Sequence, residues 1–383
     1  MNLPIKVIFA FSLLFVCYQW STAQSWQQPK LQVLYQAGTK GYDQMRIPSI
    51  IKAADGTLLA FAEARKTAGD AGDIDLVCRR SSDQGKSWSE MFTIWDDGEN
   101  TCGNPCPVLD QQSGTIFLLM TQNLGHDGER DIIRGTAEST RTVWVAQSDD
   151  HGNTWTQPRE ITSEVKKPEW GWFATGPGVG IQIQQGPRQG RLVVPCDFSY
   201  TVIEEDQQYE YGSHVIYSDD HGKTWQLGGT ITPKVNECQM VELSDGNGTL
   251  LINMRSYFGR NLRTQSVSYD GGASWTSPAD VPDLVEPVCQ ASMIRFTSPG
   301  DDQSLLLFGN PASTNRRHNF TIRGSHDDGK SWPLIRTIFP GPSAYSSMVR
   351  LNDEEIGVFF EGGDASPYEN IYFTTINISN WLP

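Results

Sequence analysis

One eight-residue pattern, Ser-x-Asp-x-Gly-x-Ser/Thr-Trp, constrains the fold of this chain more than any other feature. Its copies occupy Ser81–Trp88, Ser148–Trp155, Ser218–Trp225, Ser268–Trp275 and Ser325–Trp332. A motif that recurs at intervals of tens of residues indicates one supersecondary unit per copy. Within each copy, Asp bonds the turn backbone, Gly supplies a positive φ and Trp packs on the flanking strands. The motifs therefore predict a series of tight hairpins, and acids such as Asp83 and Asp150 are interpreted as structural.

Short apolar segments bounded by turn residues lie between the motifs, and they read as strands. Examples are 57–61, 75–79, 142–146, 191–194, 250–254 and 305–308. No long stretch has a helical period. About 360 mature residues at about 60 per unit give about six units. The sequence therefore predicts an all-β fold, a six-bladed β-propeller of four-stranded antiparallel blades whose sixth blade lacks a motif.

The N-terminus and the charge limit where the protein acts and what it binds. Residues 1–23 have the cation, apolar run and small-residue end of an export signal, so we expect cleavage near Ala23 and an exported protein. We expect residues 24–383 to form a single domain and no other segment to cross a membrane. The net charge of −15 argues against a nucleic-acid partner, which would need clustered cations.

The mature chain would keep six cysteines, and an exported protein can form disulfides. Cys102 and Cys106 are close enough in sequence to pair, but six cysteines allow fifteen pairings. Small buried thiols with at most one bridge are the simplest interpretation. No paired C-x-x-C motif is present, and we expect no metal site.

Several segments outside the hairpin motifs resemble one enzyme family, the exo-sialidases (neuraminidases) of glycoside hydrolase family 33. The similarity covers about residues 41–382. The matching segments occur in family order: Arg46-Ile47-Pro48, 59–65 (LAFAEAR), 101–105 (TCGNP), 176–178 (GPG), 236–239 (NECQ), 253–256 (NMRS), 308–311 (FGNP) and Tyr345-Ser346. Two positions depart from the family pattern, Met45 before Arg-Ile-Pro and Val179 after Gly-Pro-Gly, and they leave the preferred N-acyl group open.

The resemblance implies three arginines that bind the carboxylate of a sialic acid, namely Arg46, Arg255 and Arg317. Guanidinium suits this role because it makes paired hydrogen bonds to a planar carboxylate. Arg316 is the competing assignment for Arg317. The resemblance also implies that Glu361 holds the first arginine in place.

The resemblance implies Tyr345 as nucleophile, because a neutral phenol avoids the repulsion that a carboxylate would meet at a carbon already bearing one. A phenol has an ordinary pKa near 10, so Tyr345 needs a neighbouring base. The resemblance implies Glu237 as that base, and Glu242 is the competing assignment. Nearby arginines would favour the phenolate. The resemblance also implies Asp70 as the residue that acts as general acid and then as general base.

Other acids and substrate contacts complete the implied site. Asp73 and Asp75 compete with Asp70 for the acid/base role. Glu63 and Arg65 resemble the family's contacts to ring hydroxyls.

We therefore expect an exported, monomeric exo-α-sialidase that hydrolyses terminal sialic acid from sialylated glycans with retention and needs no cofactor. Transfer to a sugar acceptor, an intramolecular variant with an anhydro product, and preference for a deaminated sialic acid would use the same residues. A non-catalytic sialic-acid-binding propeller is the alternative outside enzymes.

Overall fold

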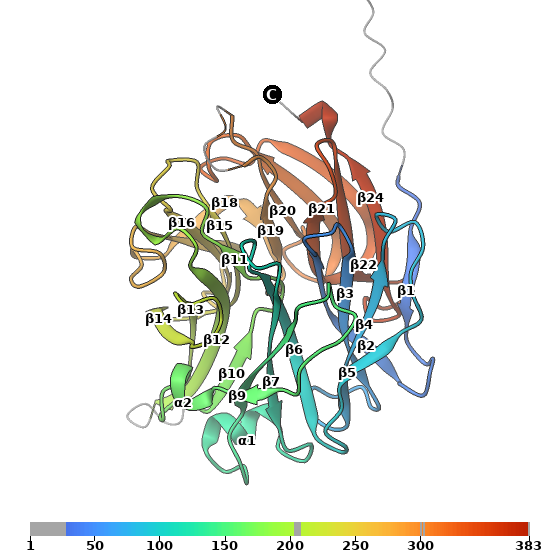
Figure 1. The fold of residues 1–383 in the computed structure, drawn as a ribbon, viewed down its shortest axis with the longest axis vertical. Helices are drawn as coiled ribbons and strands as arrows, with labels where there is room; N and C mark the ends of the chain where they lie inside the picture. Colours follow the sequence, from blue (N-terminus) through green and yellow to red (C-terminus); the bar gives the residue numbers. More distant parts are fainter. Residues whose placement is uncertain (1–27, 203–207, 299–300, 302, 382–383) are drawn as a thin grey trace, which may run out of the picture.

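The computed structural model describes residues 28–202, 208–298, 301 and 303–381, and strands account for most of them (Figure 1). Helices are few and short in these residues: α1 (Glu129–Arg134), α2 (Thr162–Val165) and two 3-10 turns at Gly186–Arg188 and Ser379–Trp381. No helix in the described ranges is long and apolar enough to cross a membrane. The expected export signal, residues 1–23, lies outside the described residues.

The first half of the described chain forms an eight-stranded and a five-stranded sheet. The eight-stranded sheet contains β2 (Gln44–Lys52), β3 (Leu58–Arg65), β4 (Ile74–Ser81), β5 (Phe92–Trp95), β6 (Thr101–Leu109), β7 (Ile116–Asn123), β8 (Thr142–Ser148) and β9 (Arg159–Glu160). The five-stranded sheet contains β10 (Trp172–Thr175), β11 (Ile181–Gln182), β12 (Leu192–Val202), β13 (Gln208–Ser218) and β14 (Gln226–Ile231).

The second half forms a four-stranded and a seven-stranded sheet. The four-stranded sheet contains β15 (Val235–Glu242), β16 (Leu250–Ser256), β17 (Leu262–Ser268) and β18 (Ala279–Val285). The seven-stranded sheet contains β1 (Gln32–Gln36), β19 (Ser292–Arg295), β20 (Leu306–Pro311), β21 (His318–Ser325), β22 (Leu334–Arg350), β23 (Glu355–Gly362) and β24 (Asn370–Asn377).

The two larger sheets consist of smaller antiparallel units. A single parallel bridge, Ile74 to Thr101, joins the two halves of the eight-stranded sheet. The long strand β22 pairs with β21 as far as Pro342 and with β23 from Ser343 onward, so it belongs to two units. The prediction of an all-β fold built from four-stranded antiparallel sheets is confirmed.

The repeated motif locks each unit to its neighbour. In the first copy, the Ser81 hydroxyl accepts from the Gly85 amide at 2.8 Å, and Asp83 accepts from the Ser87 amide at 2.9 Å. Gly85 has a φ of +85°, and a Cβ placed on it would lie 2.2 Å from the Phe373 ring on β24. Glycine is therefore required both for the turn and for close contact with the next unit. Hydrogen bonds from the Ser87 hydroxyl, the Ser87 amide and the Ser81 hydroxyl lower the pKa of Asp83 to about 2, which agrees with a structural role.

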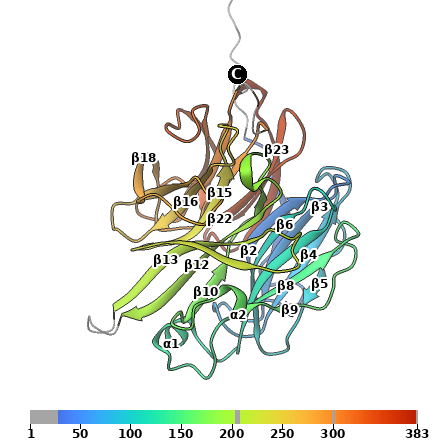
Figure 2. The same cartoon turned by 60° about the vertical axis from the view of Figure 1, so that its left-hand side comes forward.

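The first strands of successive units converge on the segment Gly176–Gly178. The Pro177 carbonyl accepts from the side-chain amides of Gln239 on β15, at 3.2 Å, and Gln290 before β19, at 3.0 Å. The Ser49 hydroxyl on β2 donates to the Gly178 carbonyl at 2.7 Å. Segments more than a hundred residues apart in the sequence therefore meet at this point. Figures 1 and 2 show β2 and β15, the strands that carry two of these contacts, from two directions.

The core lies between the sheets rather than at one central point. All eight residues of β3 are buried, because sheets pack against both of its faces. The six cysteines of the described chain are all buried free thiols, and Cys102 and Cys106 are not joined. Their packing agrees with the interpretation as small buried residues.

Candidate active site

Arg46 lies at an irregularity of β2, where the pairing with β3 shifts register between Arg46 and Ser49. Its Nε donates to Glu361 Oε1 at 2.7 Å, and the Glu361 side chain is fully buried. Glu361 also accepts from the Ile47 amide at 2.9 Å and, through Oε2, from the Tyr345 amide at 3.1 Å. One carboxylate therefore fixes both the guanidinium of Arg46 and the backbone that carries Tyr345.

Tyr345 lies at the meeting point of three arginines. The Cζ atoms of Arg46 and Arg317 lie 5.2 and 5.4 Å from the centre of its ring. Arg255 donates to the Tyr345 hydroxyl at 3.3 Å. The structure thus brings together three side chains from β2, β16 and the segment before β21.

Glu237 accepts a hydrogen bond from the Tyr345 hydroxyl. The two oxygen atoms are 2.5 Å apart, and the second oxygen of Glu237 accepts from Arg255 at 2.7 Å. Burial and the Glu237 charge raise the pKa of Tyr345 well above its usual value, although Arg255 and Arg317 act in the opposite direction. The arginines therefore favour the phenolate, as expected, but in the free protein the phenol keeps its proton.

Asp70 lies at the edge of this cluster on the loop between β3 and β4. Its side chain is 70% exposed, and Arg65 Nη1 donates to it at 2.6 Å. Partial desolvation would raise the pKa of the Asp70 carboxyl, but the Arg65 guanidinium outweighs it and holds the pKa below its usual value. Asp70 is thus an accessible carboxylate held by one buried arginine.

Glu63 and Arg65 form a buried pair beside Asp70. Arg65 donates to Glu63 Oε2 through Nε at 2.9 Å and through Nη2 at 2.6 Å. Glu63 Oε1 accepts from the Asn104 amide at 2.7 Å. Both oxygen atoms of the Glu63 carboxylate therefore accept hydrogen bonds from other groups of the protein.

The competing assignments lie elsewhere or make other contacts. Arg316 is exposed, whereas Arg317 faces Tyr345. Asp75 is buried and accepts from the Tyr42 hydroxyl at 2.5 Å. Glu242, at the far end of β15 from Glu237, accepts from the amides of residues 184 and 185. Asp73 is half-buried on the same loop as Asp70.

Some residues at the site were not singled out from the sequence. The Tyr368 ring lies 4.2 Å from the Arg46 Cζ, and its hydroxyl accepts from Arg317 at 2.9 Å. Glu129, the first residue of α1, has a raised pKa because of burial and the nearby charges of Asp70 and Glu237. No sequence motif surrounds either residue, so only the fold could place them.

The described residues contain no group of three or more His, Cys, Asp and Glu side chains arranged to hold a metal ion. The two departures from the family pattern are close to the central strands. Met45 is buried, and the Val179 amide donates to Gln239 at 3.3 Å.

Comparison with known proteins places this arrangement in a family. Residues 56–358 match the family described as "BNR repeat-like domain". The sialidase of Micromonospora viridifaciens is 35% identical over 87% of this chain, and sialidase-3 of Bos taurus is 30% identical over 89% of this chain and 91% of its own length. The chain belongs to the sialidase family.

Solved structures agree with this membership. A structure titled "Hadza microbial sialidase Hz136" superposes with a TM-score of 0.79 and 29% identity, covering 91% of this chain and 69% of the other. The intramolecular trans-sialidase of Ruminococcus gnavus, at 20% identity and a TM-score of 0.72, shares the fold of this sialidase-family chain. The chain spans 52% of the Micromonospora sialidase and 62% of a Bacteroides fragilis sialidase.

Proposed function

We propose that the protein is an exo-α-sialidase that releases terminal sialic acid from sialylated glycans with retention of configuration. The observation that carries the proposal is the hydrogen bond from the Tyr345 hydroxyl to Glu237, formed among three arginines. Such a cluster combines a site for a carboxylate with an uncharged nucleophile and its base. The family membership of the chain supports the same activity.

Arg46, Arg255 and Arg317 would bind the carboxylate on the anomeric carbon of the substrate. Each guanidinium offers several N–H donors in one plane, which suits a planar anion. Burial disfavours the charge of Arg46, but the Glu361 carboxylate keeps this guanidinium charged and in one orientation. The net charge of −15 does not prevent this binding, because distant surface charges are screened beyond about 8–10 Å at physiological salt.

In the first step, the Tyr345 oxygen attacks the anomeric carbon while Glu237 takes the phenolic proton. Asp70 donates a proton to the glycosidic oxygen, and the bond between that oxygen and the anomeric carbon breaks. The products are an aryl glycoside, in which the anomeric carbon is bonded to the Tyr345 oxygen, and a neutral aglycone alcohol. The base is needed because the resting phenol has a raised pKa.

In the second step, the Asp70 carboxylate takes a proton from water as the water oxygen attacks the anomeric carbon. The bond to Tyr345 breaks, and Glu237 returns the proton to the phenolate oxygen. Two inversions give net retention. Asp70 is suited to both steps because it is exposed and can reach the leaving group and then water.

We extend the proposal to the architecture and setting of the enzyme. The strand pairing supports six four-stranded blades, with β22 shared between two of them and β1 paired with β24 at the closure. Five of these blades would carry the repeated motif. We propose a single catalytic domain over residues 24–383, export directed by residues 1–23, and action as a monomer without a cofactor.

Proton NMR of the first-released sugar, with an α2,3-sialoside as substrate, tests the mechanism. We expect free sialic acid to appear first as the α-anomer and to mutarotate later. A β-anomer as first product would contradict the covalent mechanism. An anhydro product or a new sialoside would show that the same site transfers instead of hydrolysing.

Tyr345→Phe tests the nucleophile. We expect at least a hundredfold loss of kcat on a fluorogenic sialoside, because no phenolic oxygen remains to attack. Tyr269→Phe is the matched control, since Tyr269 is 75% exposed on a repeated motif and should keep full activity. Full activity of Tyr345→Phe would exclude our nucleophile.

A further inference from the structure

Arg141, just before β8, is a buried arginine whose hydrogen-bond partners are neutral groups. It donates to Asn123 Oδ1 at 2.5 Å, to Asn104 Oδ1 at 2.5 Å and to the Thr121 hydroxyl at 3.0 Å. Its Cζ lies 4.0 Å from the centre of the Trp172 ring. Within the described ranges, no carboxylate oxygen lies within 4.0 Å of its guanidinium. A buried cation without an ion-pair partner is costly, which indicates a role beyond packing.

Asn104 connects this arginine to the Glu63 carboxylate. Asn104 lies at an irregularity of β6 and has a φ of +53°, a conformation that asparagine tolerates. Its side-chain oxygen accepts from Arg141, and its backbone amide donates to Glu63 Oε1 at 2.7 Å. A Cβ on Gly103 would lie 2.7 Å from Glu63 and 3.0 Å from Arg141, so both side chains press against this glycine.

Glu63 in turn orients Arg65, which is the sole hydrogen-bond donor to the Asp70 side chain among the described residues. Arg65 is held on one side by two hydrogen bonds to Glu63 and reaches Asp70 with Nη1. The same Nη1 donates to the Gly69 carbonyl at 3.0 Å. The direction of the exposed Asp70 carboxylate thus depends on groups buried beneath it.

We propose that Arg141 is a positioning residue that fixes the acid/base carboxylate of Asp70. The connection runs through Asn104, Glu63 and Arg65. The inference rests on the proposed function, because Asp70 needs a fixed direction only if it transfers a proton. Proton transfer requires hydrogen-bond distance to the leaving oxygen, so a small displacement of Asp70 reduces the rate.

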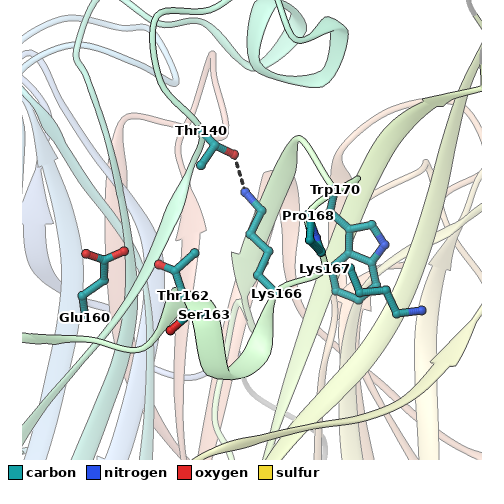
Figure 3. Close-up of a pocket in the computed structure, with 8 residues that line it drawn as sticks. All are labelled: Thr140, Glu160, Thr162, Ser163, Lys166, Lys167, Pro168 and Trp170. Carbon is teal, nitrogen blue, oxygen red and sulfur yellow. Dashed lines mark hydrogen bonds between the residues drawn. The ribbon is translucent and has the colours of Figure 1, made fainter.

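Lys166 holds the backbone of Arg141 through a separate set of hydrogen bonds. Its ammonium donates to the Arg141 carbonyl at 2.6 Å, to the Thr140 hydroxyl at 2.5 Å and to the Gly171 carbonyl at 2.7 Å. It lines a pocket of about 430 Å³, and Figure 3 shows its amine directed toward Thr140. These contacts use all three of its donors, so the lysine anchors the wall of the pocket and leaves no donor for a ligand.

Substrates with different leaving groups test the proposal. A sugar alkoxide is a poor leaving group and needs the proton from Asp70, whereas 4-nitrophenolate leaves without one. We expect Arg141→Met to lower kcat/KM on 3′-sialyllactose by about 30-fold or more, within the range that acid catalysis contributes. On 4-nitrophenyl sialoside the loss should stay below about threefold. A general structural defect, or weaker binding of sialic acid, would lower both values equally and overturn the proposal.

A second variant and a matched control complete the experiment. Asn104→Gly tolerates the positive φ and keeps the amide that bonds Glu63, but it removes the contact to Arg141, so it should show the same dependence on the leaving group. Arg191→Met is the control, because Arg191 is also buried and stacks 3.8 Å from the centre of an aromatic ring, that of Tyr217. Arg191 also forms an ion pair with Asp219, so this variant reports a general packing defect and should leave the ratio of the two kcat/KM values at the wild-type value. The same leaving-group dependence in this control would overturn the proposal.

The wild-type activities distinguish an error in the proposed function from an error in the positioning role. If wild type hydrolyses neither substrate, the sialidase activity itself is wrong. If wild type hydrolyses both and Arg141→Met behaves like wild type, only the positioning role is wrong.

Discussion

Replacing Glu361 with glutamine should destabilise the fold strongly, although the two side chains have nearly the same shape. Glu361 Oε1 accepts from Arg46 Nε and the Ile47 amide, and Oε2 accepts from the Tyr345 amide. A glutamine can present only one carbonyl oxygen. Whichever way it turns, its NH₂ group faces a donor, and Arg46 keeps a charge without a partner.

The size of the effect follows from these contacts. An unsatisfied buried backbone amide costs about 1–3 kcal/mol, and removing one partner of a buried ion pair costs about 3–5 kcal/mol. Because the terms overlap in one cluster, we expect a loss of about 3–5 kcal/mol in the free energy of unfolding. Urea denaturation followed by tryptophan fluorescence measures it, with the slope against urea checked for two-state behaviour.

Glu242→Gln provides the comparison. Glu242 is also buried and accepts from two backbone amides, at 2.6 and 3.0 Å, but no arginine lies within ion-pair distance in the described chain. Burial raises the pKa of the Glu242 carboxyl, so its ionised form is already less favourable in the folded protein. Glu242→Gln should therefore lower the free energy of unfolding by less, about 1–2 kcal/mol. A loss below about 1 kcal/mol in Glu361→Gln, or equal losses in the two variants, would refute the reasoning.

Three further predictions follow from other parts of the molecule. Because Asp70 must carry a proton to act as acid and Arg65 holds its pKa below the usual value, kcat/KM should fall as pH rises from about 4 to 8; a flat profile over this range would contradict the role. Gly85→Ala should lower the free energy of unfolding, measured by urea denaturation, by about 3 kcal/mol or more, because the added Cβ would overlap the Phe373 ring. Gly56→Ala is the control: its added Cβ has no atom within 4 Å, so it should cost about 1 kcal/mol, which is the strain of the positive φ alone. Equal losses in the two variants would refute the packing role. Dithiothreitol should leave the Tm unchanged, since the described cysteines are free; a fall of several degrees would reveal a disulfide.

Much of the fold was predictable because its information is local. Each repeated motif contains its own acceptors, its glycine and its tryptophan, so the turn can be recognised without knowing what surrounds it. The strands between the motifs can also be recognised locally, because each is a short apolar segment bounded by turn residues. The spacing of the copies, with short strands between them, then indicated repeated four-stranded units.

The site was predictable in part. The sequence pointed to Arg46, Tyr345 and Glu237 because family motifs surround them. Tyr368 and Glu129 have no such context, and Arg141 has no motif that links it to Asp70. Their proximity depends on sheets that pack side by side, and no pattern along the chain encodes that distance.

By itself, the sequence determined the repeating turn, the strand class and the residues that we propose bind the substrate and attack it. Only the tertiary structure decided that a carboxylate at position 361 fixes an arginine at position 46, and that the phenol at 345 keeps its proton next to Glu237. The reason is physical: turn chemistry is set by neighbours along the chain, whereas burial and the field of surrounding charges arise only when distant strands meet.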